Sequence, residues 1–411
     1  MMVLTDSFKF KLLNISLFIM FSLPVIPDYI RPYAIIFLGL SLLIANINRS
    51  FNFNLKFFLI NSGIYVLMAL SLFYSENLDY GFNKLETMAS LIVLPLLFSF
   101  FPKFALKKVK ANLSNYLLIY SIAILIYNII SLVYHFGHYG KTTLIHYPTV
   151  NRIAQGPYNI HPIYLSMHIC TAILFSFFIL KKLKTKWKIA LMVVLDFVLL
   201  FFLFVLLKKG LIIVLGFTSI IFVLFQRSKK LLYVGFALIA INVVIIISIP
   251  QYRSKFMELT KIEDVNKGGP TSTNIRYTIY RSALYNFLKS PLIGYGLGDH
   301  KDVLLEGFKE KSKELYKNRY NTHNQYISFM LSLGIIGLLY FLYFLGFNLV
   351  LGIRYNNQLL ILLVVFYGMI MLFENILERE NGVIYFSFFI NFFGLMSYYE
   401  HQDRKNKTLN I

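Results

Sequence analysis

The sequence predicts an all-α polytopic membrane protein. Apolar windows of about 17 to 25 residues recur along the whole chain, and each is long enough to cross a hydrocarbon core of about 30 Å. Hydrophobic residues make up 57% of the 411 residues and charged residues only 14%, whereas charged residues are roughly 25% of a typical soluble domain. The longest polar stretch is residues 250–323. It is too short to be a separate soluble domain of a size comparable to the membrane part. We therefore expect a single integral-membrane domain over residues 1–411.

Twelve candidate spans follow from these windows, and the basic residues orient them. Cytoplasmic loops of membrane proteins carry an excess of Lys and Arg. With the N-terminus in the cytoplasm, most Lys and Arg outside the long polar stretch fall on the cytoplasmic side, and both termini carry basic clusters. Both termini are therefore expected inside, and the loop 250–323, between spans nine and ten, outside. The expected spans are residues 8–26, 33–47, 55–75, 84–101, 115–136, 161–180, 188–207, 210–225, 231–249, 324–350, 358–376 and 383–399.

The outer loop 250–323 has signals for two amphipathic helices. Four consecutive polar residues from Thr271 offer N-cap choices for a helix over 275–289, in which Ile279, Ala283 and Phe287 fall on one stripe. Ser290-Pro291 should end this helix. Glycines at positions 294, 296 and 298 then predict a tight bend, and a second, densely charged helix is expected over about 301–317.

The net charge of +21 raises the question of nucleic acid. Basic loops that contact anionic headgroups explain this charge in a membrane protein, and no basic soluble module exists to bind nucleic acid. The single cysteine, Cys170, lies in an apolar run and indicates only a small buried side chain. We expect membrane lipids as partners and no nucleic acid.

Four cations are candidate anion ligands on the outer side. Lys208 and Lys209 join two very apolar spans through a short link that ends in Gly210. These lysines either snorkel to lipid phosphate or form an anion site with the N–H groups of the helix that follows. Arg276 and Arg281 lie on the first loop helix, about 140° apart around its axis, and either pair with nearby carboxylates or bind phosphate oxygens through their planar forks. Together these residues predict a diphosphate site better than a carboxylate site.

His323 is the candidate general base. It lies in the run NTHN, where the outer loop enters span ten, and an imidazole exchanges protons near neutral pH. A lone histidine is more often structural, but its place beside predicted phosphate ligands favours catalysis. Possible supporting residues are His161, Asn324 and Glu374, the last of which could orient a base or bind a sugar hydroxyl. No pair of histidines has metal-ligand spacing on a helix face, and the run from Asp299 to Asp302 is better explained as a solvated charged loop, so we predict no metal.

These motifs resemble those of the bacterial O-antigen ligases and O-antigen polymerases (WaaL/Wzy type). The shared features are an arginine- and aromatic-rich helix, here from Arg276 to Leu284, the segment PLIGYGLGD at residues 291–299, and the pair His323-Asn324 that opens the next span. The basic corner of that superfamily is matched by Lys208-Lys209-Gly210. A lysine at position 209, where arginine is more usual, would give a less rigid phosphate contact.

The resemblance implies an inverting membrane glycosyltransferase without metal or other cofactor. Its donor would be a glycan on undecaprenyl diphosphate, presented at the periplasmic face of the bacterial inner membrane. By carry-over to matching positions, Arg276 and Lys209 would stabilise the diphosphate as leaving group, and His323 would activate the acceptor hydroxyl. Arg281 matches no motif position and is included for its charge alone.

The predicted function is transfer of a lipid-linked glycan. The preferred prediction is an O-antigen ligase, which uses lipid A-core as acceptor. An O-antigen or surface polysaccharide polymerase, which extends a growing glycan, is the alternative that these residues leave open. A protein O-oligosaccharyltransferase is less favoured because the chain lacks a large extra outer domain. A polysaccharide transporter should carry its charges at the bilayer midplane, whereas here the candidate residues gather at one face.

Overall fold

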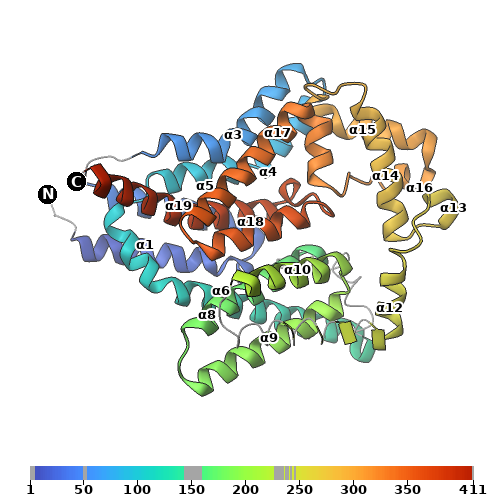
Figure 1. Ribbon diagram of the computed structural model, residues 1–411. Helices are drawn as coiled ribbons and strands as arrows, with labels where there is room; N and C mark the ends of the chain where they lie inside the picture. The colour runs from blue at the N-terminus through green and yellow to red at the C-terminus, as the bar shows by residue number, and fades with distance from the viewer. Residues whose placement is uncertain are drawn as a thin grey trace. The chain divides into compact units, whose positions relative to one another are not determined.

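The computed structural model describes residues 5–49, 53–142, 160–225 and 250–409, with a few isolated positions between 236 and 249 (Figure 1). Within these residues the regular elements are helices, and no strand occurs. Eight of the described helices are long and apolar enough to cross a membrane, and two shorter apolar helices cover Lys209–Leu224 and Gln358–Ile370. The predicted all-α polytopic membrane fold is confirmed.

The helices follow the expected spans, with differences at their ends. The first half contains α1 (Asp6–Phe21), α2 (Arg31–Asn46), α3 (Leu55–Ser71), α6 (Lys103–Tyr139), α8 (Pro162–Lys182), α9 (Lys186–Leu206) and α10 (Lys209–Phe225). The later spans are α17 (Gln325–Arg354), α18 (Gln358–Ile370) and α19 (Glu380–Leu409). Expected span nine, 231–249, lies largely outside the described residues, so the count of twelve stays a prediction.

Two boundaries differ from expectation for local reasons. The expected span 84–101 is two helices, α4 (Leu78–Thr87) and α5 (Ser90–Ser99), with Pro95 inside the second. Helix α6 begins at Lys103 rather than near residue 115, because the basic run after Pro102 is itself helical. A proline is favourable just before or in the first turn of a helix, where no N–H partner is lost. Hydropathy therefore marked the apolar part of α6 and not its start.

The chain forms two compact units. The first comprises residues 1–55, 96–215 and 398–411, and the second comprises residues 56–95 and 216–397. The boundary between them passes through α5, α10 and α19. In the first unit α8 packs against both α6 and α9, and α1 packs against α2 and α6. Buried hydrogen bonds such as Tyr120 Oη to His168 Nδ1, 2.9 Å, link α6 to α8.

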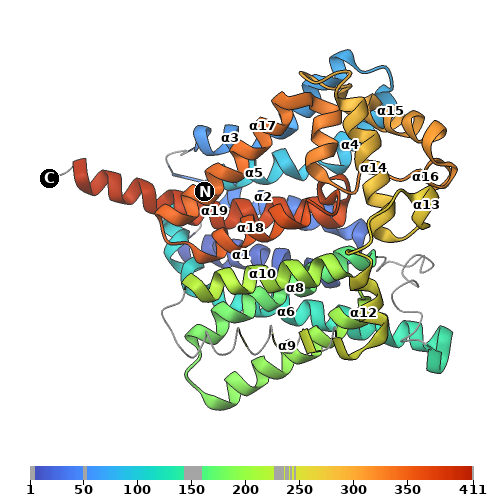
Figure 2. The same cartoon turned by 45° about the vertical axis from the view of Figure 1, so that its right-hand side comes forward.

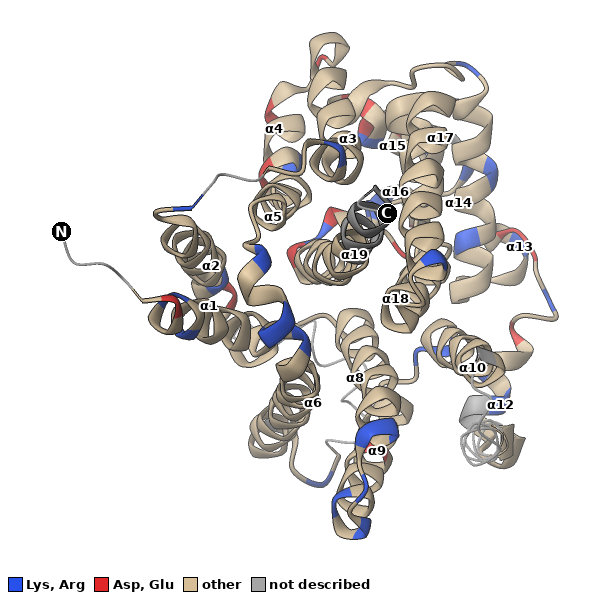
Figure 3. Ribbon diagram, turned by 60° about the vertical axis from the view of Figure 1, so that its left-hand side comes forward, with Lys and Arg blue, Asp and Glu red and all other residues tan. Residues whose placement is uncertain are grey.

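The second unit is built around α19. Figure 3 shows this helix surrounded by α3, α5, α17 and α18. In the window that would cross the membrane, 94% of its residues are buried. Phe386 of α19 packs against Phe344 of α17 and Tyr367 of α18, and Ser387 donates to the carbonyl oxygen of Ser90, 2.6 Å. A helix that is apolar on all sides is expected in such a central position.

The polar stretch folds onto the start of α17. Its helices are α12 (Pro250–Met257), α13 (Val265–Gly268), α14 (Ser272–Phe287), α15 (Gly296–Lys311) and α16 (Lys313–Lys317), and α13 to α16 lie together at one end of the unit (Figure 2). Thr271 caps α14 by accepting from the N–H of Asn274, as its sequence allows. The small core of this segment also includes two residues of α17. Its buried members are Val265, Ile279, Ala283, Leu304, Leu305, Phe308, Leu315, Ile327 and Leu331.

The glycine-rich bend is shorter than expected, because α15 begins at Gly296 and not near residue 301. Gly294 and Gly296 have φ of 69° and 84°, a region that glycine enters without a steric penalty. A Cβ on Gly298, within α15, would lie 2.6 Å from the carbonyl oxygen of Asn77. The carboxylate of Asp299 then accepts from the N–H groups of Glu76 and Asn77, each at 2.8 Å. This close approach attaches the polar stretch to the turn before α4.

Candidate active site

Three segments of the second unit meet around Tyr280. They are α14, the turn 321–324 before α17, and the segment 371–378 that follows α18. The Tyr280 hydroxyl lies 2.9 Å from the carbonyl oxygen of Leu372 and 3.1 Å from that of His323. Burial raises the pKa of Tyr280, so its hydroxyl stays protonated and donates. Tyr280 thus ties α14 to both other segments.

His323 is held in a turn with an unusual backbone conformation. Its φ is 45°, in the left-handed region that non-glycine residues rarely adopt. The N–H of His323 donates to the side-chain oxygen of Asn321 at 3.2 Å. Asn324 caps α17 by accepting from the N–H groups of Tyr326 and Ile327, 3.0 and 3.1 Å, which satisfies two donors of the helix start. The predicted supporting residue Asn324 therefore shapes the turn that presents His323.

The His323 ring is paired with Glu374. Nδ1 of His323 lies 3.2 Å from Oε2 of Glu374, and the two side chains are 23% and 8% exposed. A carboxylate only accepts hydrogen bonds, so Nδ1 carries the proton and Nε2 is left with a lone pair. The Tyr320 ring packs near the imidazole, with centroids 5.8 Å apart. This arrangement orients an imidazole so that its Nε2 can accept a proton.

Arg276 lies on α14, one turn before Tyr280. Its Nε donates to the carbonyl oxygen of Phe373 at 3.3 Å, and a terminal nitrogen donates to that of Ser272 at 3.2 Å. Among the described residues no carboxylate forms an ion pair with it. Glu258, one of the carboxylates near it in the sequence, pairs with Lys255 at 2.9 Å. Two carbonyl oxygens fix the direction of the guanidinium and leave its charge unneutralised.

Arg281 lies apart from this group on α14. It is exposed, and its guanidinium carbon is 5.8 Å from the centroid of the Tyr277 ring. Five positions along an α-helix turn a side chain by about 140°. Arg281 therefore does not share the hydrogen-bonded surroundings of Arg276.

A buried polar network, which sequence reasoning missed, lies beneath the His323 turn. Asn375 bonds to Thr322 and Asn324 on either side of His323. Glu378 accepts from Asn375 and from the hydroxyl of Ser328, both at 2.5 Å. The signal of this network in the sequence is weak: three polar residues, Glu374, Asn375 and Glu378, stand among apolar ones around the end of the expected span 358–376.

The surroundings of Glu378 favour its ionised form. Burial opposes ionisation, but Lys84, His300 and the hydrogen bonds from Ser328 and Asn375 outweigh it and hold the pKa of Glu378 below its ordinary value. Burial lowers the pKa of the adjacent Lys301 to about 8, and its amine donates to the carbonyl oxygens of Arg319 and Tyr320 at 2.8 and 2.7 Å. The network is thus a set of compensated charges at the base of the turn.

Lys208, Lys209 and His161 belong to the first unit. Helix α9 ends at Leu206, Leu207 has a φ of 53°, and α10 starts at Lys209. The carbonyl oxygen of Lys208 accepts from the N–H groups of Leu211 and Ile212. The short link between two apolar helices is therefore present as expected. His161 caps α8, its Nδ1 accepting from the N–H of Ile163 at 3.3 Å.

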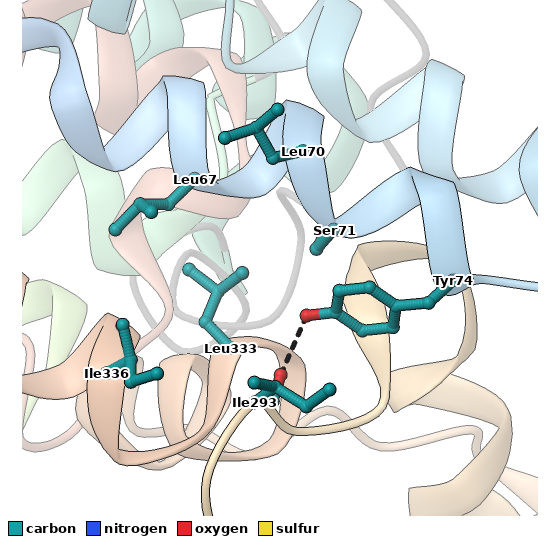
Figure 4. Close-up of a pocket in the computed structure, with 8 residues that line it drawn as sticks. Leu67, Leu70, Ser71, Tyr74, Ile293, Leu333 and Ile336 are labelled. Carbon is teal, nitrogen blue, oxygen red and sulfur yellow. Dashed lines mark hydrogen bonds between the residues drawn. The ribbon is translucent and has the colours of Figure 1, made fainter.

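A separate apolar pocket of about 200 Å³ lies in the second unit (Figure 4). The hydroxyl of Tyr74 crosses its edge and donates to the carbonyl oxygen of Ile293 at 2.7 Å. Its lining has no charged side chain and shares no residue with the group around His323. The lining residues are Leu67, Leu70, Ser71, Tyr74, Ile293, Leu333, Ile336 and Gly337. Within the described residues, no three His, Cys, Asp or Glu side chains form a group that could hold a metal ion.

Comparison with known proteins yields one family match. Residues 194–342 match the family described as O-antigen ligase. This segment contains the lysine link, α14, the turn with His323 and the first half of α17, while Glu374 and Asn375 follow it. A search of curated proteins gives no match.

Proposed function

We propose that this chain, whose residues 194–342 match the O-antigen ligase family, transfers a glycan from undecaprenyl diphosphate to an acceptor hydroxyl. We assign it the role of an O-antigen ligase that attaches O-antigen to lipid A-core. The observation that carries the proposal is the His323–Glu374 pair, 3.2 Å apart, on a turn bonded to the same α14 that carries Arg276. A base and an unneutralised cation are the two groups that such a transfer needs.

In the proposed step, the acceptor oxygen attacks the anomeric carbon of the donor sugar. The bond between that carbon and the diphosphate oxygen breaks, and the diphosphate leaves with the electron pair. Nε2 of His323 takes the proton of the acceptor hydroxyl, while Glu374 stabilises the resulting imidazolium through Nδ1. Attack opposite the leaving group inverts the anomeric centre.

Arg276 would stabilise the charge that grows on the leaving diphosphate. A preorganised cation costs no reorganisation at the moment of reaction, and the carbonyl oxygens of Ser272 and Phe373 already hold this guanidinium in place. Lys208, Lys209 and Arg281 remain proposed diphosphate ligands on the strength of their sequence positions. The reaction would take place at the periplasmic face of the inner membrane, with both chain termini in the cytoplasm.

Gene deletion with complementation tests the proposal. Deletion should remove all attached O-chain from lipid A-core, and the wild-type gene should restore it. His323→Ala should fail to restore it, although the protein reaches the membrane at wild-type abundance by immunoblot. His168→Ala is the matched control, since it removes a buried imidazole that bonds to Tyr120 of α6.

Each alternative has its own outcome. A single repeat that stays on the core after deletion would identify a polymerase, and loss of glycan from proteins would identify a protein-acceptor enzyme. Lipid-linked glycan trapped at the cytoplasmic face would indicate a transporter. Normal transfer by His323→Ala would remove this histidine from the mechanism.

A further inference from the structure

We propose that Asn375 is a positioning residue that holds His323 in its left-handed backbone conformation, and that buried Glu378 keeps the Asn375 amide in the required orientation. This inference rests on the proposed role of His323 as the base. It adds two residues, both outside the segment that matches the family, to the machinery of the site.

Asn375 bonds to both neighbours of His323. Its Oδ1 accepts from the N–H of Asn324 at 2.9 Å, and its Nδ2 donates to the hydroxyl of Thr322 at 2.8 Å. Thr322 and Asn375 are 2% and 1% exposed, so water does not compete for these bonds. The amide therefore holds the Thr322 side chain on one side of His323 and the Asn324 backbone on the other, and the φ of His323 between them is 45°.

The left-handed conformation requires such support. For a residue with a Cβ it costs free energy relative to the right-handed region, and it persists only where the surroundings impose it. The N–H and carbonyl groups of His323 are bonded to Asn321 and Tyr280. Those partners lie on the more exposed side, whereas Asn375 provides the buried side of the turn. Without Asn375, Thr322 and Asn324 lose the side chain to which both are hydrogen-bonded.

Glu378 determines which way the Asn375 amide faces. Its Oε1 accepts from Nδ2 of Asn375 at 2.5 Å, and its backbone oxygen lies 3.5 Å from the amine of Lys84. Because the lowered pKa keeps Glu378 ionised, a flipped amide would place Oδ1 against a carboxylate oxygen. That repulsion leaves one orientation, in which Oδ1 faces the N–H of Asn324.

Adjacent residues of one segment then control His323 in two ways. Asn375 fixes the backbone of the turn, and Glu374 fixes the ring through Nδ1. Since both belong to the turn 371–378, a shift of this segment moves base and orienting carboxylate together. Loss of Asn375 should instead uncouple them, which misplaces Nε2 while Arg276 keeps its two carbonyl partners.

The test compares transfer with donor-lipid binding. Asn375→Ala should reduce attachment of surface glycan in the complemented deletion strain by about 100-fold, the loss expected from a misplacement of about 1 Å. Binding of undecaprenyl diphosphate to the purified protein should change less than about threefold, because Arg276 is untouched. The control is Asn391→Ala, an equally buried amide of α19 that donates to Ser387 and should leave transfer within about threefold.

A second pair of variants keeps the inference testable if Asn375→Ala does not fold. Thr322→Val removes the hydroxyl with little change in shape and should reduce transfer at least tenfold, while Thr322→Ser keeps the hydroxyl and should retain it. In a His323→Ala background, Asn375→Ala should cause no further loss. If His323→Ala abolishes transfer but Asn375→Ala and Thr322→Val do not, the positioning role is wrong and the proposed function stands. If His323→Ala transfers normally, the proposed function itself fails.

Discussion

At the scale of single residues, Arg276 has the features of an anion-binding side chain. Its guanidinium donates to the carbonyl oxygens of Phe373 and Ser272, which orient it without neutralising its charge. A guanidinium binds two phosphate oxygens in parallel, whereas an ammonium acts as a point charge. The identity of the cation at this position should therefore matter as well as its charge.

Substitution of Arg276 separates these two contributions. Arg276→Ala should weaken binding of undecaprenyl diphosphate by about 10-fold or more, since a charge-assisted hydrogen bond contributes about 1.5–3 kcal/mol. Arg276→Lys should lie between Ala and wild type, because it keeps the charge and loses the fork. Isothermal titration of the purified protein measures both, with Lys309→Ala, an exposed cation near Glu306, as the control. Equal affinity of the Ala and Lys variants would refute the fork argument.

The residues of the site differ in how visible they are in the sequence. Arg276 and His323 stand out because they match motif positions of the O-antigen ligases, and Glu374 because a carboxylate is unexpected at the end of an apolar span. Thr322 and Asn375 do not, because their function comes from partners about 50 residues away, and a lone threonine or asparagine carries no sign of what it bonds to. A still longer separation explains why the sequence left Arg276 with a carboxylate as a candidate partner: one of its actual partners is the carbonyl oxygen of Phe373, 97 residues further along the chain.

At the level of elements, α17 is joined to the segment before α15 by backbone hydrogen bonds. Gly334 interrupts the helix with a φ of 66°. Around it the N–H of Tyr295 donates to Leu331 at 2.8 Å and the N–H of Ile335 donates to Pro291 at 2.8 Å. The expected span 324–350 did not include this break, because glycine is frequent in membrane helices and the pairing partner lies 40 residues earlier. Hydrophobic windows identify spans well, but they contain no information on such tertiary pairing.

Alanine at two glycines of α17 tests the importance of this junction. A Cβ at Gly334 would lie 2.2 Å from the carbonyl oxygen of Leu292, and the positive φ adds strain, so Gly334→Ala should destabilise the protein by at least about 2 kcal/mol. Gly346 lies in the same helix with nothing within 4 Å of its Cβ position. Gly346→Ala should be neutral or stabilise by up to about 1 kcal/mol. Thermal unfolding in detergent measures both, and equal midpoints would show that the junction contributes little.

For the whole molecule, the side of the membrane that holds the site follows from the parity of the spans. The sequence predicts nine spans before the loop 250–323, and the ninth, 231–249, lies largely outside the described residues. The other eight each correspond to helical structure, so the all-α membrane class follows from composition and hydropathy alone. The side occupied by His323 is instead inferred from the distribution of basic residues over the short loops, because a long loop such as 250–323 follows the charge rule poorly. It therefore needs a direct test.

Labelling of single cysteines provides that test. In a Cys170→Ala background, which removes the only cysteine, Lys107→Cys lies in the second turn of α6 and Lys141→Cys just after its end at Tyr139, and both positions are exposed. With its 37 residues, this helix is about 55 Å long at about 1.5 Å per residue and exceeds the bilayer core, so these cysteines must label from opposite sides. With both termini in the cytoplasm, a membrane-impermeant maleimide should label the Lys141→Cys variant in intact spheroplasts and the Lys107→Cys variant only after permeabilisation. The Lys309→Cys variant, in the loop 250–323, should be labelled under the same conditions as Lys141→Cys, because transfer at the periplasmic face requires this loop to lie outside. If Lys309→Cys is labelled only after permeabilisation, the site faces the cytoplasm and the proposed transfer at the periplasmic face is wrong.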